Sequence, residues 1–154
     1  MKKIALFAVV LLIILSIAAC GKPKEISIDT EAFLGEISSG NLFKDALEPI
    51  PEKTVSSVIG IDFEQIESFS YFMGAGATAE EYGVFKCSSE EYAKKLTEQF
   101  EKRVTTQRAL YETYAPDALP RLDNAIIKQS GSYAAIVIAD NHSSALSVVD
   151  KYFK

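Results

Sequence analysis

The fold is decided by residues 67–100, which read ESFSYFMGAGATAEEYGVFKCSSEEYAKKLTEQF. Apolar side chains recur at every second position from Phe69 to Met73, a period of two that is typical of a β-strand. Glycine and alanine at residues 74–77 supply a turn, and the aromatic-rich run at residues 79–86 indicates a second strand. The stretch therefore begins with a predicted β-hairpin.

The residues after this hairpin predict a long amphipathic helix that ends near Tyr114. Ser88 and Glu91 have the spacing of a capping box, in which each side chain satisfies the other's free backbone amide. Apolar residues then recur three and four positions apart, which places them on one face of a helix. The predicted inner face consists of Ala93, Leu96, Phe100, Val104, Gln107, Tyr111 and Tyr114.

The same order of elements recurs after a predicted loop at residues 116–122. Residues 125–129 and 133–139 indicate a second hairpin, and Asp140–Asn141 can cap a final helix. Two further helices are expected before the first hairpin. Their predicted ranges are residues 30–39 and 52–59, with an irregular segment between them.

The predicted fold class is therefore α+β, with the element order α-α-β-β-α-β-β-α. Two hairpins, each followed by a helix, predict a four-stranded, mainly antiparallel sheet with helices packed on one face. We expect the second face to be partly exposed or covered by the N-terminal helices.

The N-terminus predicts export from the cytoplasm. Lys2 and Lys3 precede a run from Ile4 to Ala19 that is apolar except at Ser16. This run is short for a bilayer span, which needs roughly 20 residues. A positive start followed by a short apolar stretch is typical of a secretory signal peptide.

Ile17-Ala18-Ala19-Cys20 resembles a bacterial lipobox. The resemblance implies cleavage between Ala19 and Cys20 and a diacylglycerol thioether on Cys20. The alternative is an uncleaved anchor with an incidental cysteine. We therefore expect a signal peptide at residues 1–19, a lipidated tether at residues 20–25 and a single α+β domain at residues 26–154, with the lipid anchor holding the domain to the membrane.

The composition narrows the possible functions. The chain has 154 residues with 16 Lys+Arg, 21 Asp+Glu and one His, a net charge of -5 that argues against a nucleic-acid partner. One His and two Cys exclude most metal sites built on these residues, and we expect neither a metal nor a cofactor. With Cys20 lipidated, Cys87 has no disulfide partner, and we interpret it as a small buried residue rather than a nucleophile.

No catalytic set of residues is apparent. His142 lies near Asp140, Ser143 and Ser144, but all belong to one helix start, where a nucleophile and its base rarely face each other. Neighbouring Glu80 and Glu81 on a strand point to opposite faces, so they cannot share a proton or a metal.

One turn is a candidate for ligand contact. Gly74, Gly76 and Thr78 lie in the first hairpin's turn, and loops carried by rigid hairpins often bind ligands. The Gly-x-Gly pattern lacks the remaining features of a phosphate-binding loop, so a plain hairpin turn is the simpler interpretation.

Taken together, residues 76–86 (GATAEEYGVFK), Tyr114-Ala115-Pro116 and the hairpin at residues 124–140 resemble domain-of-unknown-function family 4358, a family of bacterial extracytoplasmic lipoproteins. The resemblance implies an α+β fold on the outer face of the cell membrane of a Gram-positive bacterium. It implies no activity and no functional residues.

We therefore expect a non-enzymatic, lipid-anchored domain that binds a protein, peptide or cell-wall component. The alternatives are a cell-envelope hydrolase and a small-molecule-binding accessory of a transporter.

Overall fold

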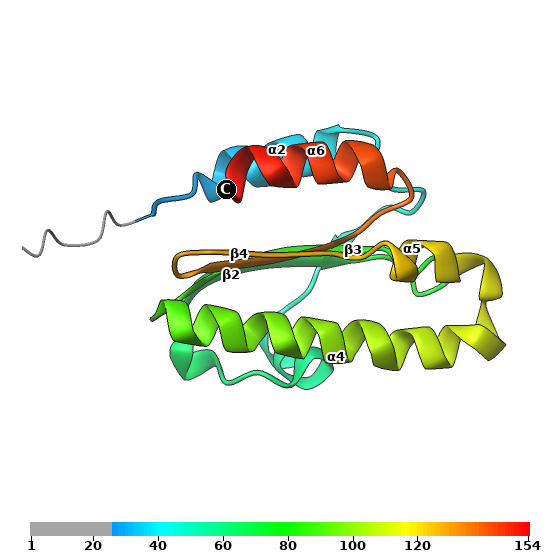
Figure 1. Ribbon diagram of the computed structural model, residues 1–154. Helices are drawn as coiled ribbons and strands as arrows, with labels where there is room; N and C mark the ends of the chain where they lie inside the picture. Colours follow the sequence, from blue (N-terminus) through cyan, green and yellow to red (C-terminus); the bar gives the residue numbers. More distant parts are fainter. Residues whose placement is uncertain (1–25) are drawn as a thin grey trace, which may run out of the picture.

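The computed structural model describes residues 26–154. The predicted signal peptide, its cleavage position at Ala19–Cys20 and the lipidation at Cys20 lie outside the described residues. Residues 26–154 form three layers, with a β-sheet between two layers of helices (Figure 1). This arrangement confirms the α+β class.

The sheet is antiparallel, with the strand order β1-β2-β3-β5-β4. Both predicted hairpins are present, and the inner strands of the two hairpins lie side by side at the centre of the sheet. The strands are β1 (Glu48–Pro49), β2 (Ile66–Met73), β3 (Glu81–Cys87), β4 (Ile126–Ser130) and β5 (Tyr133–Ile138).

The prediction of four strands was wrong, because β1 adds a fifth. Its residues Glu48 and Pro49 pair with Met73 and Phe72 at the end of β2. Prolines at positions 49 and 51 indicated an irregular segment here. Proline has no N–H to donate, and it is tolerated in a sheet chiefly on an edge strand, which is where Pro49 lies.

The helices match the sequence pattern in most places, and none within residues 26–154 has both the length and the apolar character needed to span a bilayer. Short helical turns occupy most of the segment at residues 116–122, which was predicted to be a loop. The helical elements are α2 (Thr30–Ser39), α3 (Glu52–Val55), the π-helical turn η1 (Ser56–Gly60), the 3-10 turns η2 (Phe63–Gln65) and η3 (Pro116–Ala118), α4 (Glu90–Tyr114), α5 (Leu119–Asp123) and α6 (His142–Tyr152).

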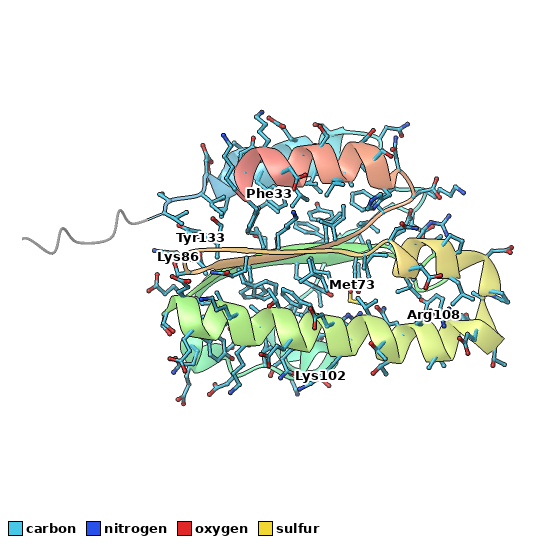
Figure 2. All side chains as sticks on the ribbon, viewed as in Figure 1. Phe33, Met73, Lys86, Lys102, Arg108 and Tyr133 are labelled. Carbon is cyan, nitrogen blue, oxygen red and sulfur yellow. The ribbon has the colours of Figure 1, made fainter. Side chains whose placement is uncertain are left out.

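The helices cover both faces of the sheet, which corrects the prediction that the two helices following the hairpins, α4 and α6, share one face. The N-terminal helix α2 covers the second face, as one of the two expectations for that face had it. Helix α4 lies on one side, whereas α6 joins α2 on the other (Figure 1). In Figure 2, Phe33 of α2 points toward the sheet from one side and Met73 points toward α4 on the other. The physical reason is β5, in which every side chain is buried, so both of its faces need a cover.

Two local details of α4 also differ from the prediction. Its N-cap is Ser89, whose Oγ accepts a hydrogen bond from the N–H of Tyr92 at 3.1 Å. Ser88 instead donates its hydroxyl to Oε1 of Gln65. Tyr114, predicted to face inward, is 70% exposed because the sheet does not extend under the last turn of the helix.

Candidate functional site

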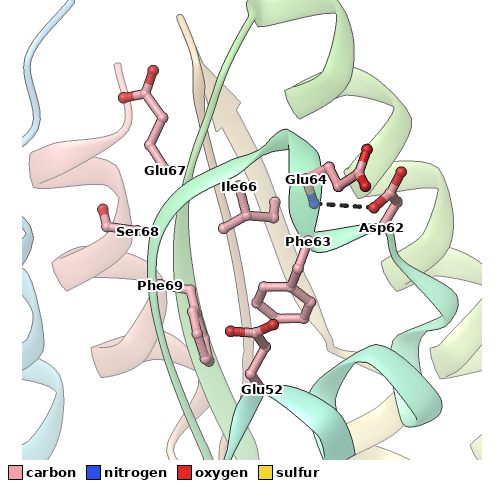
Figure 3. A pocket seen from close by; sticks show the side chains of 8 residues that line it. All are labelled: Glu52, Asp62, Phe63, Glu64, Ile66, Glu67, Ser68 and Phe69. Carbon is pink, nitrogen blue, oxygen red and sulfur yellow. Dashed lines mark hydrogen bonds between the residues drawn. The ribbon is translucent and has the colours of Figure 1, made fainter.

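A cleft of about 640 Å³ opens beside strand β2, at the sheet edge that β1 leaves uncovered. One side of the cleft is the first half of β2, and the other is formed by α3 and η2 (Figure 3). Its lining residues are Glu52, Asp62, Phe63, Glu64, Ile66, Glu67, Ser68 and Phe69. All of these residues except Glu52 lie within residues 62–69. The pattern of the sequence did not indicate this site, because the way η2 and α3 sit against the edge of β2 is decided by tertiary packing.

Two phenylalanines form the apolar floor of the cleft. The rings of Phe63 and Phe69 meet edge to face, with 4.8 Å between their centroids. Phe69 also stacks on Phe85 of β3 in the core. Both floor residues are only half-buried, so part of each ring faces solvent in the cleft.

The loop that carries Phe63 is held by three hydrogen bonds. Asp62 caps η2, since its Oδ1 accepts a hydrogen bond from the N–H of Glu64 at 3.0 Å. The Tyr92 hydroxyl of α4 donates to the backbone oxygen of Asp62 at 2.9 Å and accepts from its N–H at 3.1 Å. Helix α4 therefore fixes the position of this side of the cleft.

The rim of the cleft is acidic. Glu67 forms an ion pair with Lys86 at 2.8 Å, and Figure 3 shows its side chain pointing away from the two rings. Glu52, Asp62 and Glu64 are exposed, and within residues 26–154 none of them forms an ion pair with Lys or Arg. These three carboxylates leave uncompensated negative charge around an apolar floor, an arrangement that suits a cationic group with an apolar stem.

The turn predicted to contact a ligand is engaged by the protein itself. The Thr78 hydroxyl donates to Oδ2 of Asp45 at 2.7 Å, and the backbone oxygen of Gly76 accepts a hydrogen bond from the Tyr111 hydroxyl. Gly74 packs so closely on Asp45 that a Cβ there would lie 2.9 Å from its carboxylate. The turn is thus tied to the loop before β1 and to α4, and ligand contact there stays a prediction.

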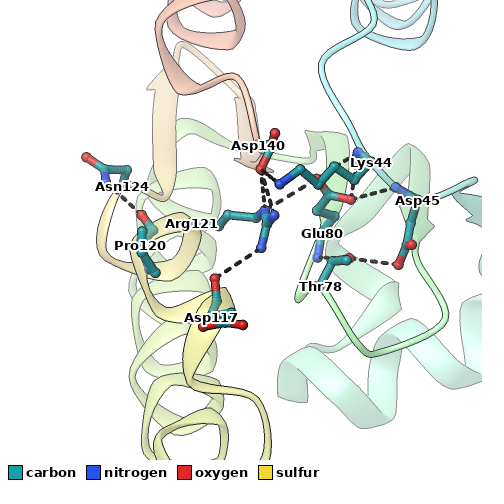
Figure 4. Close-up of polar contacts among 9 residues, drawn as sticks. All are labelled: Lys44, Asp45, Thr78, Glu80, Asp117, Pro120, Arg121, Asn124 and Asp140. Atoms are coloured by element: carbon teal, nitrogen blue, oxygen red, sulfur yellow. Dashed lines mark hydrogen bonds and ion pairs between the residues drawn. The ribbon is translucent and has the colours of Figure 1, made fainter.

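Beside this turn lies a cluster of polar contacts around the buried carboxylate of Glu80 (Figure 4). Glu80 accepts hydrogen bonds from the backbone N–H groups of Lys44 and Asp45 at 2.9–3.0 Å. Arg121 lies between two acids, with its Nε 3.6 Å from Glu80 and its Nη2 2.6 Å from Asp140. Since these groups satisfy one another, the cluster joins the loop before β1 to α5 rather than offering a free site.

The adjacent Glu81 points to the opposite face, which confirms the prediction for this pair. There it forms a buried ion pair with Arg103 of α4. Burial lowers the pKa of Arg103, but the hydrogen bonds and charge of Glu81 outweigh burial and raise that pKa above its usual value. Arg103 follows Phe100 by three residues and precedes Gln107 by four, so the helical period could have identified it as inward-facing.

Cys87 and His142 are not arranged as a nucleophile and base. Cys87 is 1% exposed, and burial together with the charge of Glu67 raises the pKa of its thiol to about 11. His142 lies in α6 with Nδ1 2.9 Å from the backbone oxygen of Asn124. Across residues 26–154, no three His, Cys, Asp or Glu side chains are placed to hold a metal ion.

These features define an α+β protein with helices on both faces of an antiparallel sheet and a cleft at one sheet edge. A family model described as domain of unknown function (DUF4358) matches residues 43–139, more than half of the chain, and the chain belongs to this family. The matched segment contains all five strands and the cleft, whereas α2 and α6 lie outside it. Searches of curated proteins and of solved structures found no match.

Proposed function

We propose that this chain is a non-enzymatic binding domain, held on the outer face of the cell membrane by a lipid on Cys20, that binds a protein or peptide partner in the cleft beside β2. The observation that carries the proposal is the cleft itself. In the described part of the chain, residues 26–154, it combines an aromatic floor, three carboxylates without a cationic partner and an uncovered sheet edge. Exposed aromatic surface rimmed by polar groups is typical of interaction sites.

The position of the cleft suits a membrane-anchored protein. Ile26, the first described residue, lies against Gly131 in the turn between β4 and β5. The next residue of that turn, Ser132, accepts a hydrogen bond from Cys87, which pairs with Ile66 of the cleft. The chain therefore joins the domain at the end of the sheet where the cleft lies. A tether at residues 20–25 spans at most roughly 20 Å, which would keep the cleft close to the membrane surface.

A photo-crosslinking experiment in the producing cell tests this function. A benzophenone amino acid is placed at Ser68 in the cleft or, as a control, at exposed Ser147 of α6. We expect a discrete crosslinked product from position 68 and none from position 147. The product should disappear when Glu52→Lys and Glu64→Lys are combined, because reversed charge repels a cationic partner.

The charge-reversed control is Glu31→Lys combined with Glu101→Lys, which changes the net charge equally at exposed positions outside the cleft. Crosslinking at position 68 should persist in this control. The proposal would be contradicted if positions 68 and 147 gave equal yields of the same crosslinked product. It would also be contradicted if the product from position 68 persisted in the variant that combines Glu52→Lys with Glu64→Lys.

A further inference from the structure

Strand β2 has an outer edge that is only partly covered. Within residues 26–154, β1 pairs with Phe72 and Met73, and the chain then leaves the edge at Pro51 to begin α3. Among the described residues, no strand pairs with the segment from Ile66 to Ser70 on this side. An uncovered edge presents backbone donors and acceptors to any chain that approaches in extended form.

The direction of these backbone groups follows from the neighbouring hydrogen bonds. The N–H of Ile50 donates to the backbone oxygen of Tyr71 at 2.8 Å, so Tyr71 turns its backbone groups toward the outer edge. The direction alternates along an antiparallel strand, and Phe69 therefore turns its N–H and C=O the same way. A register shift between Ile66 and Ser68 interrupts the regular ladder before that point. Phe69 is thus the residue at which an added strand would pair.

We propose, building on the cleft as the binding site of the proposed function, that its occupant is an extended peptide segment carrying Lys or Arg at alternate positions. The segment adds to the sheet as a strand antiparallel to β2 and continues the line of β1. Its main chain exchanges hydrogen bonds with Phe69. This mode of binding is strand addition at a sheet edge, in which the main chain gives affinity and alternate side chains give specificity.

The side chains around the edge determine which residues the peptide should carry. In an antiparallel pair, opposite residues point to the same face, so the guest residue opposite Phe69 points to the floor that Phe69 shares with Phe63. A Lys or Arg there lays its apolar stem on the two rings and brings its charge to the acidic rim, where Glu52 and Glu64 have no cationic partner among residues 26–154. The neighbouring guest residues point to the opposite face and only need to favour an extended chain.

A second copy of this chain fits the edge poorly. Two β2 edges related by a two-fold axis would bring the acidic rim of one copy, with Glu52, Asp62 and Glu64, toward the acidic rim of the other. Like charges facing each other across paired strands are destabilising. The acidic rim favours a cationic segment of another protein.

The test uses the intact lipoprotein in neutral detergent micelles and an acetylated hexapeptide of alternating Lys and Thr. In one derivative the backbone nitrogens of the Lys residues are methylated, and in a matched derivative those of the Thr residues are methylated. Methylated Lys residues lose the N–H that faces Phe69, whereas methylated Thr residues lose an N–H that faces away. We expect about ten-fold weaker binding for the first derivative and less than about two-fold for the second, measured by calorimetry.

The outcomes separate this inference from the proposed function. If both derivatives bind as the parent peptide does, strand addition is wrong even though the acidic cleft binds cations. If the Thr-methylated peptide is the weaker one, the antiparallel pairing is wrong. If Glu52→Lys with Glu64→Lys leaves parent binding unchanged, or if an alternating Glu–Thr peptide binds equally well, the cleft is not the site and the proposed function fails with it. A dimer whose formation competes with the peptide would identify a second copy as the occupant and overturn the inference.

Discussion

Arg103 of α4 and Glu81 of β3 form an ion pair within the core between helix and sheet. Their closest atoms, Nη2 and Oε2, are 2.5 Å apart, and the side chains are 8% and 1% exposed. Nε of Arg103 donates to the same carboxylate, and Nη1 donates to the backbone oxygen of Val58 in η1 at 3.2 Å. One guanidinium thus joins α4, the sheet and η1, the turn that follows α3, and α3 supplies Glu52 to the cleft.

Removing one partner of this ion pair should strongly destabilise the protein. We expect Arg103→Met to lower the free energy of unfolding by about 3–5 kcal/mol, because it leaves the Glu81 carboxylate buried without a counter-charge. Urea denaturation followed by circular dichroism measures the change. Lys94→Met is the matched control, since it breaks the exposed Glu90–Lys94 pair and should cost less than about 1 kcal/mol.

Removing both partners should cost less than the sum of the single changes. In Arg103→Met combined with Glu81→Leu, no charge is left buried, and apolar side chains fill part of the space. A double variant as unstable as the sum of the two single variants would show that the residues act independently, contrary to their geometry.

Gly83→Ala should destabilise the protein because its position in β3 has no room for a methyl group. A Cβ there would lie 2.3 Å from the ring of Tyr71, which is itself 1% exposed. We expect a loss of about 1–3 kcal/mol, seen as a lower urea midpoint. Gly35→Ala in α2 meets no atom within 4 Å and should instead gain about 0.5–1 kcal/mol. If the two substitutions change the urea midpoint by a similar amount, Gly83 is not packed closely against Tyr71.

Cys87 should be unreactive in the folded protein. Its thiol is buried, so alkylation by iodoacetamide at pH 8 should occur only after unfolding in urea, as followed by mass spectrometry. Ser68→Cys provides an exposed thiol for comparison and should react at once. Rapid alkylation of Cys87 without denaturant would contradict its burial.

The raised pKa of the Cys87 thiol should make the stability of the folded protein depend on pH. Burial raises the pKa of Cys87 from 9.0 to about 11, so the unfolded chain loses this proton at a lower pH than the folded protein does. Deprotonation then favours the unfolded chain, and stability should fall as the pH rises from about 9 to about 11. Cys87→Ala should show a smaller fall over this interval in urea titrations. Parallel pH profiles for the two proteins would exclude a contribution from this thiol.

Membrane attachment should depend on one of the two cysteines. Cys20→Ala is expected to remove the diacylglycerol mass from the protein, whereas Cys87→Ala should leave it unchanged. Mass spectrometry of the intact protein, extracted from the membrane fraction, measures both. A bare Cys20 thiol, or a wild-type chain that still carries residues 1–19, would disprove lipid anchoring.

The local elements were predictable to a large extent. Alternation around Phe69–Met73 predicted β2, and the three-and-four spacing after Ser89 predicted α4, because both signals arise from residues close together in the chain. Strand β1 was not predictable, since two residues that include Pro49 carry no strand signal and form a strand only by pairing with β2. The ion pairs of Glu80 and Glu81 were missed because their partners, Arg121 and Arg103, lie on other elements.

The residues of the cleft were also visible in the sequence, whereas their arrangement was not predictable. The carboxylates of Glu52, Asp62 and Glu64 and the rings of Phe63 and Phe69 are visible in the sequence, but nothing there indicates that they line one cavity. Their meeting depends on where α3 leaves the edge of the sheet and on the Tyr92 contact that holds the loop at Asp62. Both depend on packing between elements.

The sequence by itself determined the two hairpins, the long amphipathic helix and the apolar faces that each element has to bury. Only the tertiary structure decided that α4 covers one face of the sheet while α2 and α6 cover the other, and that no strand of the described residues covers the first half of β2 on its outer edge. The physical reason is one of range. Backbone preference and hydrophobic period act over a few neighbouring residues, whereas the choice of face and the coverage of an edge depend on burial summed over the whole domain.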